Sequence, residues 1–122
     1  MKRILIIDDD GSMRRAISRH LTAHGFKTAI ASNGREALLC LNSHSPDLIV
    51  LDMMMPEMNG PEFLEVLQAS PLHSKIPVII VTAQDIAIAV FNFRAFKVEK
   101  IIPKGVGFPD TLLATTRKIL GK

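Results

Sequence analysis

The chain has 122 residues, of which 48% are hydrophobic and 22% charged, so it fits one globular domain with one core rather than a disordered segment. One cysteine, Cys40, excludes an internal disulfide framework and a cysteine-based zinc site, and the absence of a signal-peptide pattern or a membrane-length apolar run predicts a soluble, cytoplasmic protein. The net charge of +3, with no Trp or Tyr to stack on bases, favours a basic solvated surface over direct nucleic-acid binding.

The first two apolar runs, Ile4–Ile7 and Thr28–Ala31, are each followed by a helical pattern. After the first run, apolar residues recur at helical spacing and stop before Gly25, which suits the position just past a helix C-terminus. After the second run, Asn33 can cap a helix. The apolar positions are Met13, Ile17 and Leu21 in the first helix and Ala37, Leu38 and Leu41 in the second.

Three further apolar runs follow, again with helical stretches after them: Leu48–Leu51, Val78–Val81 and Ile101–Ile102. Pro61 suits the first turn of a third helix, Asp85 can cap a fourth, and Asp110 lies in the first turn of a fifth. The runs do not alternate, as is typical of strands buried on both faces of a parallel sheet. The order (βα)₅ with right-handed crossovers predicts an α/β fold: a doubly wound, five-stranded parallel sheet in three layers. We expect one domain over residues 1–122, without a separate effector domain.

The expected fourth helix is unusually apolar, since only Asn92 and Arg94 are polar between Ile86 and Phe96. On a helical wheel Ile86, Val90 and Phe93 share one face, and Ile88, Phe91 and Ala95 share the opposite one. A helix on one side of a sheet buries only one stripe. We therefore favour an exposed apolar patch that binds a partner over an unusually enclosed helix.

Chemistry-bearing side chains follow four of the five apolar runs. They are Asp8, Asp9 and Asp10 after the first, Asp52 after the third, Thr82 after the fourth and Lys104 after the fifth. The carboxyl ends of strands in such a sheet lie at one edge, where sites form. Clustered acids repel each other unless a cation lies among them, and oxygen ligands suit Mg²⁺. A carboxylate on Mg²⁺ beside an ammonium and a hydroxyl is what an aspartyl-phosphate site needs.

Four segments in this order and spacing resemble the receiver domains of two-component response regulators, the CheY-like family: ILIIDDD, DLIVLDMMMPEMNG, VIIVTA and IIPKG. The resemblance covers essentially the whole chain and implies a flavodoxin-like fold. It also implies a phosphorylation-dependent signalling switch rather than an enzyme. Such a switch would receive a phosphoryl group from a sensor histidine kinase, a phosphotransfer protein or a small phosphodonor, and would lose it by slow self-hydrolysis.

The resemblance also implies a role for each matching residue. Asp52 is the expected phospho-acceptor, and Thr82 and Lys104 are expected to contact the phosphoryl group. The expected Mg²⁺ ligands are Asp8, Asp9, Asp52 and the backbone carbonyl of Met54. Pro56 and Gly60 match the turn that follows the acceptor. Met54 and Gln84 match the positions that tune attack by water, and the output is expected on the surface of the fourth helix, fifth strand and fifth helix.

The chain departs from this family at several positions. Gly105 follows Lys104 where proline is usual, and Ile101 replaces the switch aromatic. Lys97-Val98 replaces the Gly-Ala pair before the last strand. Without the aromatic, we expect the fourth helix to report phosphorylation to an output protein or to a second copy of the domain.

Other interpretations stay open at this point. Asp10 fits either a helix cap or a supporting role at the metal. An Asp-nucleophile phosphohydrolase would need a second acid two residues after Asp52, where Met54 stands. A binding module that has lost phosphorylation would be expected to lack Asp52 or the acid pair. A flavin or dinucleotide carrier is disfavoured, because no G-x-G-x-x-G follows a strand.

Overall fold

A computed structural model describes residues 1–43, 45–55 and 57–121, and these form one parallel sheet with helices on both faces. The strands are β1 (Arg3–Ile7), β2 (Lys27–Ala31), β3 (Leu48–Asp52), β4 (Val78–Thr82) and β5 (Lys100–Pro103). The helices are α1 (Gly11–Ala23), α2 (Gly34–Ser43), α3 (Gly60–Ala69), α4 (Ile86–Phe93) and α5 (Phe108–Leu120). The predicted (βα)₅ order and the doubly wound sheet are thereby confirmed.

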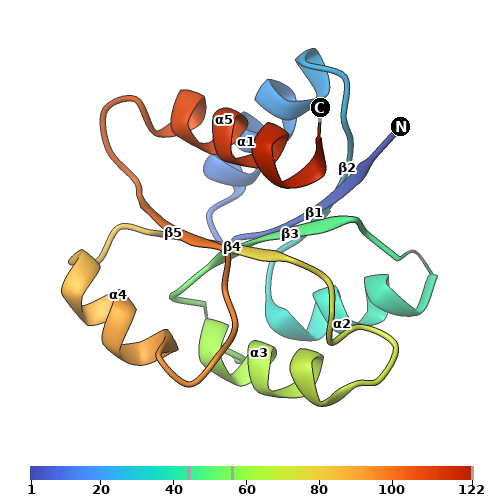
Figure 1. Cartoon of the computed structure of the whole chain (residues 1–122), viewed down its shortest axis with the longest axis vertical. Helices are drawn as coiled ribbons and strands as arrows, with labels where there is room; N and C mark the ends of the chain where they lie inside the picture. Colours follow the sequence, from blue (N-terminus) through green and yellow to red (C-terminus); the bar gives the residue numbers. More distant parts are fainter. Residues whose placement is uncertain (44, 56, 122) are drawn as a thin grey trace.

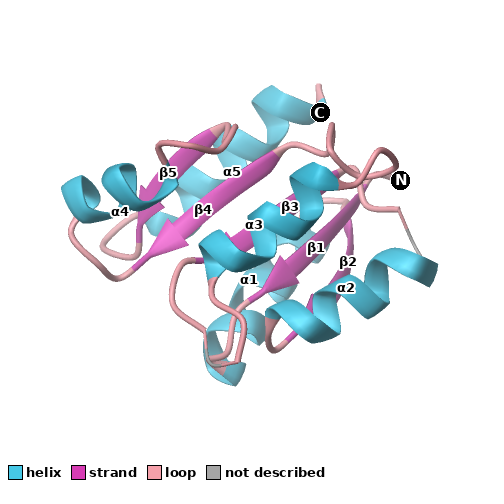
Figure 2. Cartoon of the chain, turned by 90° about the horizontal axis from the view of Figure 1, so that it is seen from below, coloured by secondary structure: helices cyan, strands magenta, loops and turns pink. Residues whose placement is uncertain are grey.

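The strand order β2-β1-β3-β4-β5 reverses between β1 and β3, where the chain crosses from one half of the sheet to the other. Figure 1 shows α1 and α5 on one face of the sheet and α2, α3 and α4 on the other, which gives three layers. All strand pairs are parallel, so the strands point the same way in Figure 2 and their carboxyl ends share one edge. A ligand site is expected at that edge, near the switch point between β1 and β3.

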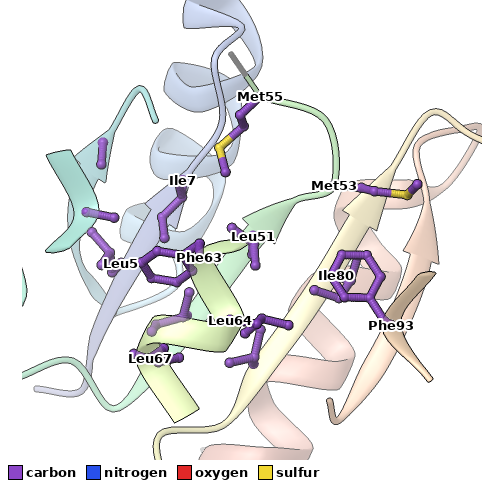
Figure 3. Packing of buried hydrophobic residues seen from close by; sticks show 14 of the residues in the cluster. Leu5, Ile7, Leu51, Met53, Met55, Phe63, Leu64, Leu67, Ile80 and Phe93 are labelled. Carbon is purple, nitrogen blue, oxygen red and sulfur yellow. The ribbon is translucent and has the colours of Figure 1, made fainter. Parts of the chain in front are cut away.

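The central strands are buried on both faces, which explains why their sequences do not alternate. Ile4, Ile6, Val50, Ile79 and Val81 pack in one apolar cluster with α1 and α5. Leu5, Ile7, Ile49, Leu51 and Ile80 pack in a second cluster with α2, α3 and α4, part of which Figure 3 draws. Burial of each such side chain contributes about 1.5–3 kcal/mol, so these two layers hold the strand ends in place.

The helix ends follow the predicted capping chemistry. Asn33 accepts a hydrogen bond from the Glu36 backbone N–H at 2.9 Å at the start of α2. Asn59 and Glu62 form a reciprocal capping box at the start of α3. Gly25, with φ +93°, follows the end of α1 in the left-handed conformation that glycine tolerates best.

Helix α4 carries the exposed apolar patch that the sequence predicts, and the structure shows which stripe is turned inward. The buried residues are Ala89 and Phe93, and Phe96 beyond the helix is half-buried. Of the face that Ile86, Val90 and Phe93 share on the helical wheel, only Phe93 is buried, and Ile86 and Val90 are exposed. Ala89, Phe93 and Phe96 are spaced i, i+4, i+7, so they form one stripe along the side of α4 that packs against the core. We name the exposed residues the α4 patch: Ile86, Ile88, Val90 and Phe91.

Within the described residues, none of the helices has both the length and the hydropathy needed to cross a bilayer.

Candidate phosphoryl site

Asp8 is the buried carboxylate at the end of β1, with 1% of its surface exposed. Its Oδ1 accepts a hydrogen bond from the Asp10 backbone N–H at 3.0 Å, which fixes the turn into α1. The Arg14 guanidinium, from the first turns of α1, donates to the Asp8 backbone carbonyl at 2.8 Å. The sequence analysis assigns no role to Arg14. This contact depends on how α1 folds back over the end of β1, and no motif signals it.

Asp10 acts as the cap of α1. Its side chain accepts from the backbone N–H groups of Ser12 at 2.9 Å and Met13 at 3.2 Å. Of the two interpretations that the sequence left open, the structure supports the cap, since the carboxylate is exposed and already engaged by the helix.

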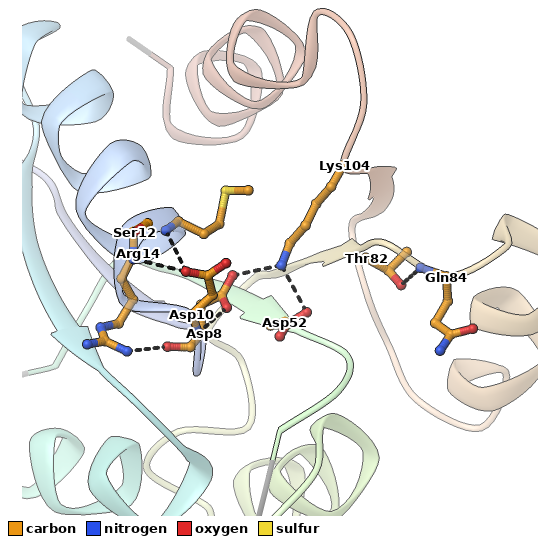
Figure 4. A network of polar contacts seen from close by, with 9 residues as sticks. Asp8, Asp10, Ser12, Arg14, Asp52, Thr82, Gln84 and Lys104 are labelled. Carbon is orange, nitrogen blue, oxygen red and sulfur yellow. Dashed lines mark hydrogen bonds and ion pairs between the residues drawn. The ribbon is translucent and has the colours of Figure 1, made fainter.

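Lys104 joins the two buried carboxylates. Its ammonium lies 2.8 Å from Asp8 Oδ2 and 3.3 Å from Asp52 Oδ1, as Figure 4 shows. The contact links residues at the ends of β1 and β3 with the loop after β5, at the two sides of the switch point. Lys104 therefore reaches the site although Gly105 stands where the resemblance expects proline.

The electrostatics of this trio are unbalanced. Burial raises the pKa of Asp52, the Asp8 carboxylate raises it further, and Lys104 opposes both, which leaves the pKa at about 7. Burial alone would lower the pKa of Lys104, but its hydrogen bond to Asp8 and the charges of Asp52 and Asp8 raise it above its ordinary value. One ammonium thus does not fully compensate the negative charge of the buried acids, so Asp52 ionises less readily than an exposed aspartate.

The carboxylates fit a hard divalent cation. Asp8, Asp9 and Asp52 each offer an oxygen, and these oxygens all lie within 4.8 Å of one another. Asp9 is exposed, so its side of the cluster faces solvent, where water can complete a coordination sphere. All the side-chain donors are oxygens, as Mg²⁺ prefers, and the carboxylates of Asp8 and Asp9 both raise the pKa of Asp52, a repulsion that a bound cation would relieve.

The turn after Asp52 is closely packed. A Cβ on Gly60 would lie 3.0 Å from the Met53 carbonyl oxygen and 3.1 Å from that of Asp52, so only glycine fits there. Met54 exposes 55% of its surface. The metal role of the Met54 carbonyl stays a prediction, and Pro56 lies outside the described residues.

Thr82 ends β4 with 1% exposure, but its hydroxyl is not bonded to Lys104 or Asp52. The hydroxyl accepts from the Gln84 backbone N–H at 2.9 Å, on the far side of Thr82 from Lys104 in Figure 4. It donates to the sulfur of Met53 at 3.7 Å. Met53 is buried in the apolar cluster on the α2, α3 and α4 face of the sheet, and the sequence analysis gives it no role at the site.

Comparison with known proteins agrees with this geometry. The sequence pattern of the response regulator receiver domain matches residues 4–116. The response regulator MprA of Mycolicibacterium vanbaalenii is 39% identical over 83 residues, which cover 68% of this chain and 35% of MprA. The chain thus spans about a third of the length of such curated relatives.

Solved structures match over nearly the whole chain. The chemotaxis protein CheY4 of Vibrio cholerae superposes with a TM-score of 0.89 at 28% identity, covering 98% of both chains. The response regulator TrrA of Thermotoga maritima, solved with Mg²⁺ and beryllofluoride, has a TM-score of 0.84 at 28% identity, covering 98% of this chain and 99% of TrrA. The flavodoxin-like fold expected from the sequence is confirmed.

Proposed function

This chain belongs to the response regulator receiver domain family, whose members are phosphorylation-dependent signalling switches, and we propose that Asp52 is the residue that receives the phosphoryl group. The observation that carries the proposal is the convergence of Asp52, Asp8 and Lys104 at one edge of the sheet. Asp52 ends the central strand β3, so its carboxylate is held firmly on the core while one side of the site stays open at Asp9.

Mg²⁺ is the proposed cofactor, held by the carboxylates of Asp8, Asp9 and Asp52 and by the Met54 carbonyl. When bound, the ion would neutralise negative charge on the phosphoryl oxygens and on the acids. The oxygen-only side-chain donor set and the close spacing of the three carboxylates support this assignment.

The chemistry then falls to the side chains of the chain itself. An ionised Asp52 oxygen attacks phosphorus, a new P–O bond forms, and the bond to the donor breaks with its electron pair leaving on the donor. The ammonium of Lys104 already lies 3.3 Å from Asp52 Oδ1, close enough to pair with the transferred group. Thr82 would donate its hydroxyl hydrogen to a phosphoryl oxygen after leaving its present partner.

We further propose that the phosphorylated form is long-lived and that the domain does not act as an enzyme. The side chains of Met54 and Gln84 are exposed near the site. Met54 has no N–H or O–H group with which to orient an attacking water. Met54→Asn would supply such a group and should speed loss of the phosphoryl group.

The proposed phosphodonor is a sensor histidine kinase or a phosphotransfer protein. The proposed output surface comprises α4, β5 and α5, with the α4 patch as the anchor for an output protein or a second copy of the domain. The patch exposes several large apolar side chains on one short helix, which a monomeric fold does not require.

The acceptor assignment is tested by intact mass after incubation with a small phosphodonor and Mg²⁺. One phosphoryl group should be added to the wild type and to Asp10→Asn, in which asparagine still caps α1. Asp52→Asn should take none, and a chelator should prevent the reaction in all three. Equal labelling of Asp52→Asn would remove Asp52 from the role.

A further inference from the structure

The hydroxyl of Thr82 is bound to a methionine sulfur inside the molecule. Thr82 Oγ1 donates to Met53 Sδ at 3.7 Å, and both residues are almost fully buried. A threonine hydroxyl has one hydrogen, and the Gln84 backbone N–H uses one of its lone pairs. The hydrogen is thus committed to the sulfur and is not available at Asp52.

A thioether sulfur is a weak acceptor, which makes this bond easy to exchange. A charged phosphoryl oxygen is a much stronger acceptor and would take the hydrogen in preference. Met53 therefore holds the hydroxyl in place while Asp52 is unmodified, without preventing its later release. An amide or carboxylate acceptor at this position would hold Thr82 more tightly.

Met53 also connects this bond to the region of α4. Its carbonyl oxygen accepts from the Gly60 backbone N–H at 3.0 Å. A Cβ on Gly60 would lie 3.0 Å from both that oxygen and the Phe93 ring. Met53 and Phe93 belong to the same buried cluster, and Figure 3 draws them on the same side of β4, near Ile80. Phe93 is the main buried anchor of α4, and it shares this buried cluster with Met53.

We propose that Met53 is a positioning residue that holds the Thr82 hydroxyl away from Asp52 in the unphosphorylated chain, and that its release is passed to α4 through Phe93. The inference rests on the proposed function in that Asp52 is taken as the acceptor. The two arrangements differ in the partner of one hydroxyl hydrogen, the sulfur of Met53 or an oxygen on Asp52. Because the sulfur loses its partner in the second arrangement, the Met53 side chain is free to repack.

The first test needs no phosphorylation. Three-bond NMR couplings report the side-chain rotamer of Thr82 in the wild type, in Met53→Leu and in Met55→Leu. Leucine conserves volume and removes the sulfur, and Met55 is a buried methionine of the same cluster, which makes it the matched control. We expect one rotamer in the wild type and Met55→Leu, and a mixture in Met53→Leu. A single unchanged rotamer in Met53→Leu overturns the proposal.

The second test measures the affinity of Mg²⁺ with beryllofluoride, a stable mimic of the phosphoryl group, by isothermal titration. Met53→Leu should bind about threefold to tenfold more tightly, because the weak bond to sulfur no longer has to be broken. In a Thr82→Val background, the same substitution should have no effect, since the hydroxyl is gone. An equal gain in both backgrounds would show a packing effect and contradict the proposal.

The third measurement follows α4 in the same samples. In the wild type, beryllofluoride should shift the Phe93 ring signals and the methyl signals of Ile86 and Ile88. In Met53→Leu, these shifts should be at most half as large. Full shifts in Met53→Leu would disprove the link to α4. If beryllofluoride binds neither the wild type nor any variant, the acceptor assignment fails, whereas the rotamer test still decides the role of Met53.

Discussion

Helices α1 and α4, which follow the strands β1 and β4 of the candidate site, differ in the composition of their outer face. Helix α1 has 13 residues and buries Ile17 and Leu21, while its other positions are mostly polar or charged. Helix α4 has 8 residues, buries Ala89 and Phe93, and exposes apolar side chains elsewhere. Their exposed fractions are 40% for Ile86, 48% for Ile88, 52% for Val90 and 61% for Phe91.

Both helices bury a similar inner stripe, so packing on the sheet does not explain the difference. The outer face of α1 is what a solvated helix needs, whereas the outer face of α4 leaves apolar area in water at a cost to solubility. The comparison teaches that the composition of α4 reflects a second requirement besides folding. That requirement fits the proposed output surface.

The largest expected effect concerns the inner stripe. Phe93→Ala should destabilise the fold by about 3–5 kcal/mol, because the ring is fully buried and its cavity cannot collapse against Gly60. Leu21→Ala, its counterpart in α1, should cost about 2–5 kcal/mol. Urea unfolding followed by circular dichroism measures both. A loss below 1 kcal/mol for Phe93→Ala would mean that α4 is not anchored by this residue.

The next effect is a pH dependence of stability, which we expect from the charged residues on the α1 side of the site and not from the neutral Thr82 on the α4 side. The pKa of Asp52 is raised from 3.8 to about 7 in the folded chain, so the folded state binds this proton more tightly than the unfolded state. Stability should therefore fall as pH rises from about 4 to 7, by up to about 4 kcal/mol in metal-free protein. Asp52→Asn should lack this loss.

The readout is the difference in unfolding free energy between the wild type and Asp52→Asn at pH 4 and pH 8 with a chelator present. Asp110→Asn, which alters an exposed acid on α5, is the control and should follow the wild type. Parallel pH profiles for the wild type and Asp52→Asn would rule out the raised pKa.

A smaller loss of stability is expected when the N-cap side chain of either helix is removed. Asp10 accepts from two backbone N–H groups of α1, and Asp85 accepts from the Ala87 N–H of α4 at 2.8 Å. Alanine at either position should cost about 1 kcal/mol. Because α4 has fewer turns, Asp85→Ala should increase amide hydrogen exchange along the whole helix, whereas Asp10→Ala should affect only the first turn of α1. The same exchange pattern in both helices would weaken the contrast between them.

The smallest effect on stability should come from the α4 patch. Phe91→Ser removes an exposed ring that contacts solvent and the Arg94 guanidinium, which lies 3.8 Å from the ring centroid. The expected cost is about 0.5–1 kcal/mol. Self-association or partner binding of the phosphorylated form, measured by sedimentation, should nevertheless weaken. Unchanged association with the fold intact would place the interface elsewhere.

The succession of strands along the chain and the residues at their ends could be predicted from the amino-acid sequence. Apolar runs without alternation predict strands buried on both faces, and parallel topology then brings Asp8, Asp52, Thr82 and Lys104 to one edge. Caps such as Asn33 and Asp85 could also be predicted, because a cap depends on a few neighbouring residues. These features are local, or follow from the rules of connection in parallel sheets.

Which face of a helix is buried, and which side-chain atoms meet, could be seen only in the folded chain. Both stripes of α4 are apolar, so periodicity could not show that Ala89 and Phe93, rather than Ile86 and Val90, face the sheet. The bond between Thr82 and Met53 joins the last residue of β4 to the residue just after β3, and the contact of Arg14 with the Asp8 carbonyl depends on how α1 crosses the end of β1. Sequence spacing sets which residues share a face, but only packing against the rest of the fold selects the face that is buried and the atoms that meet there.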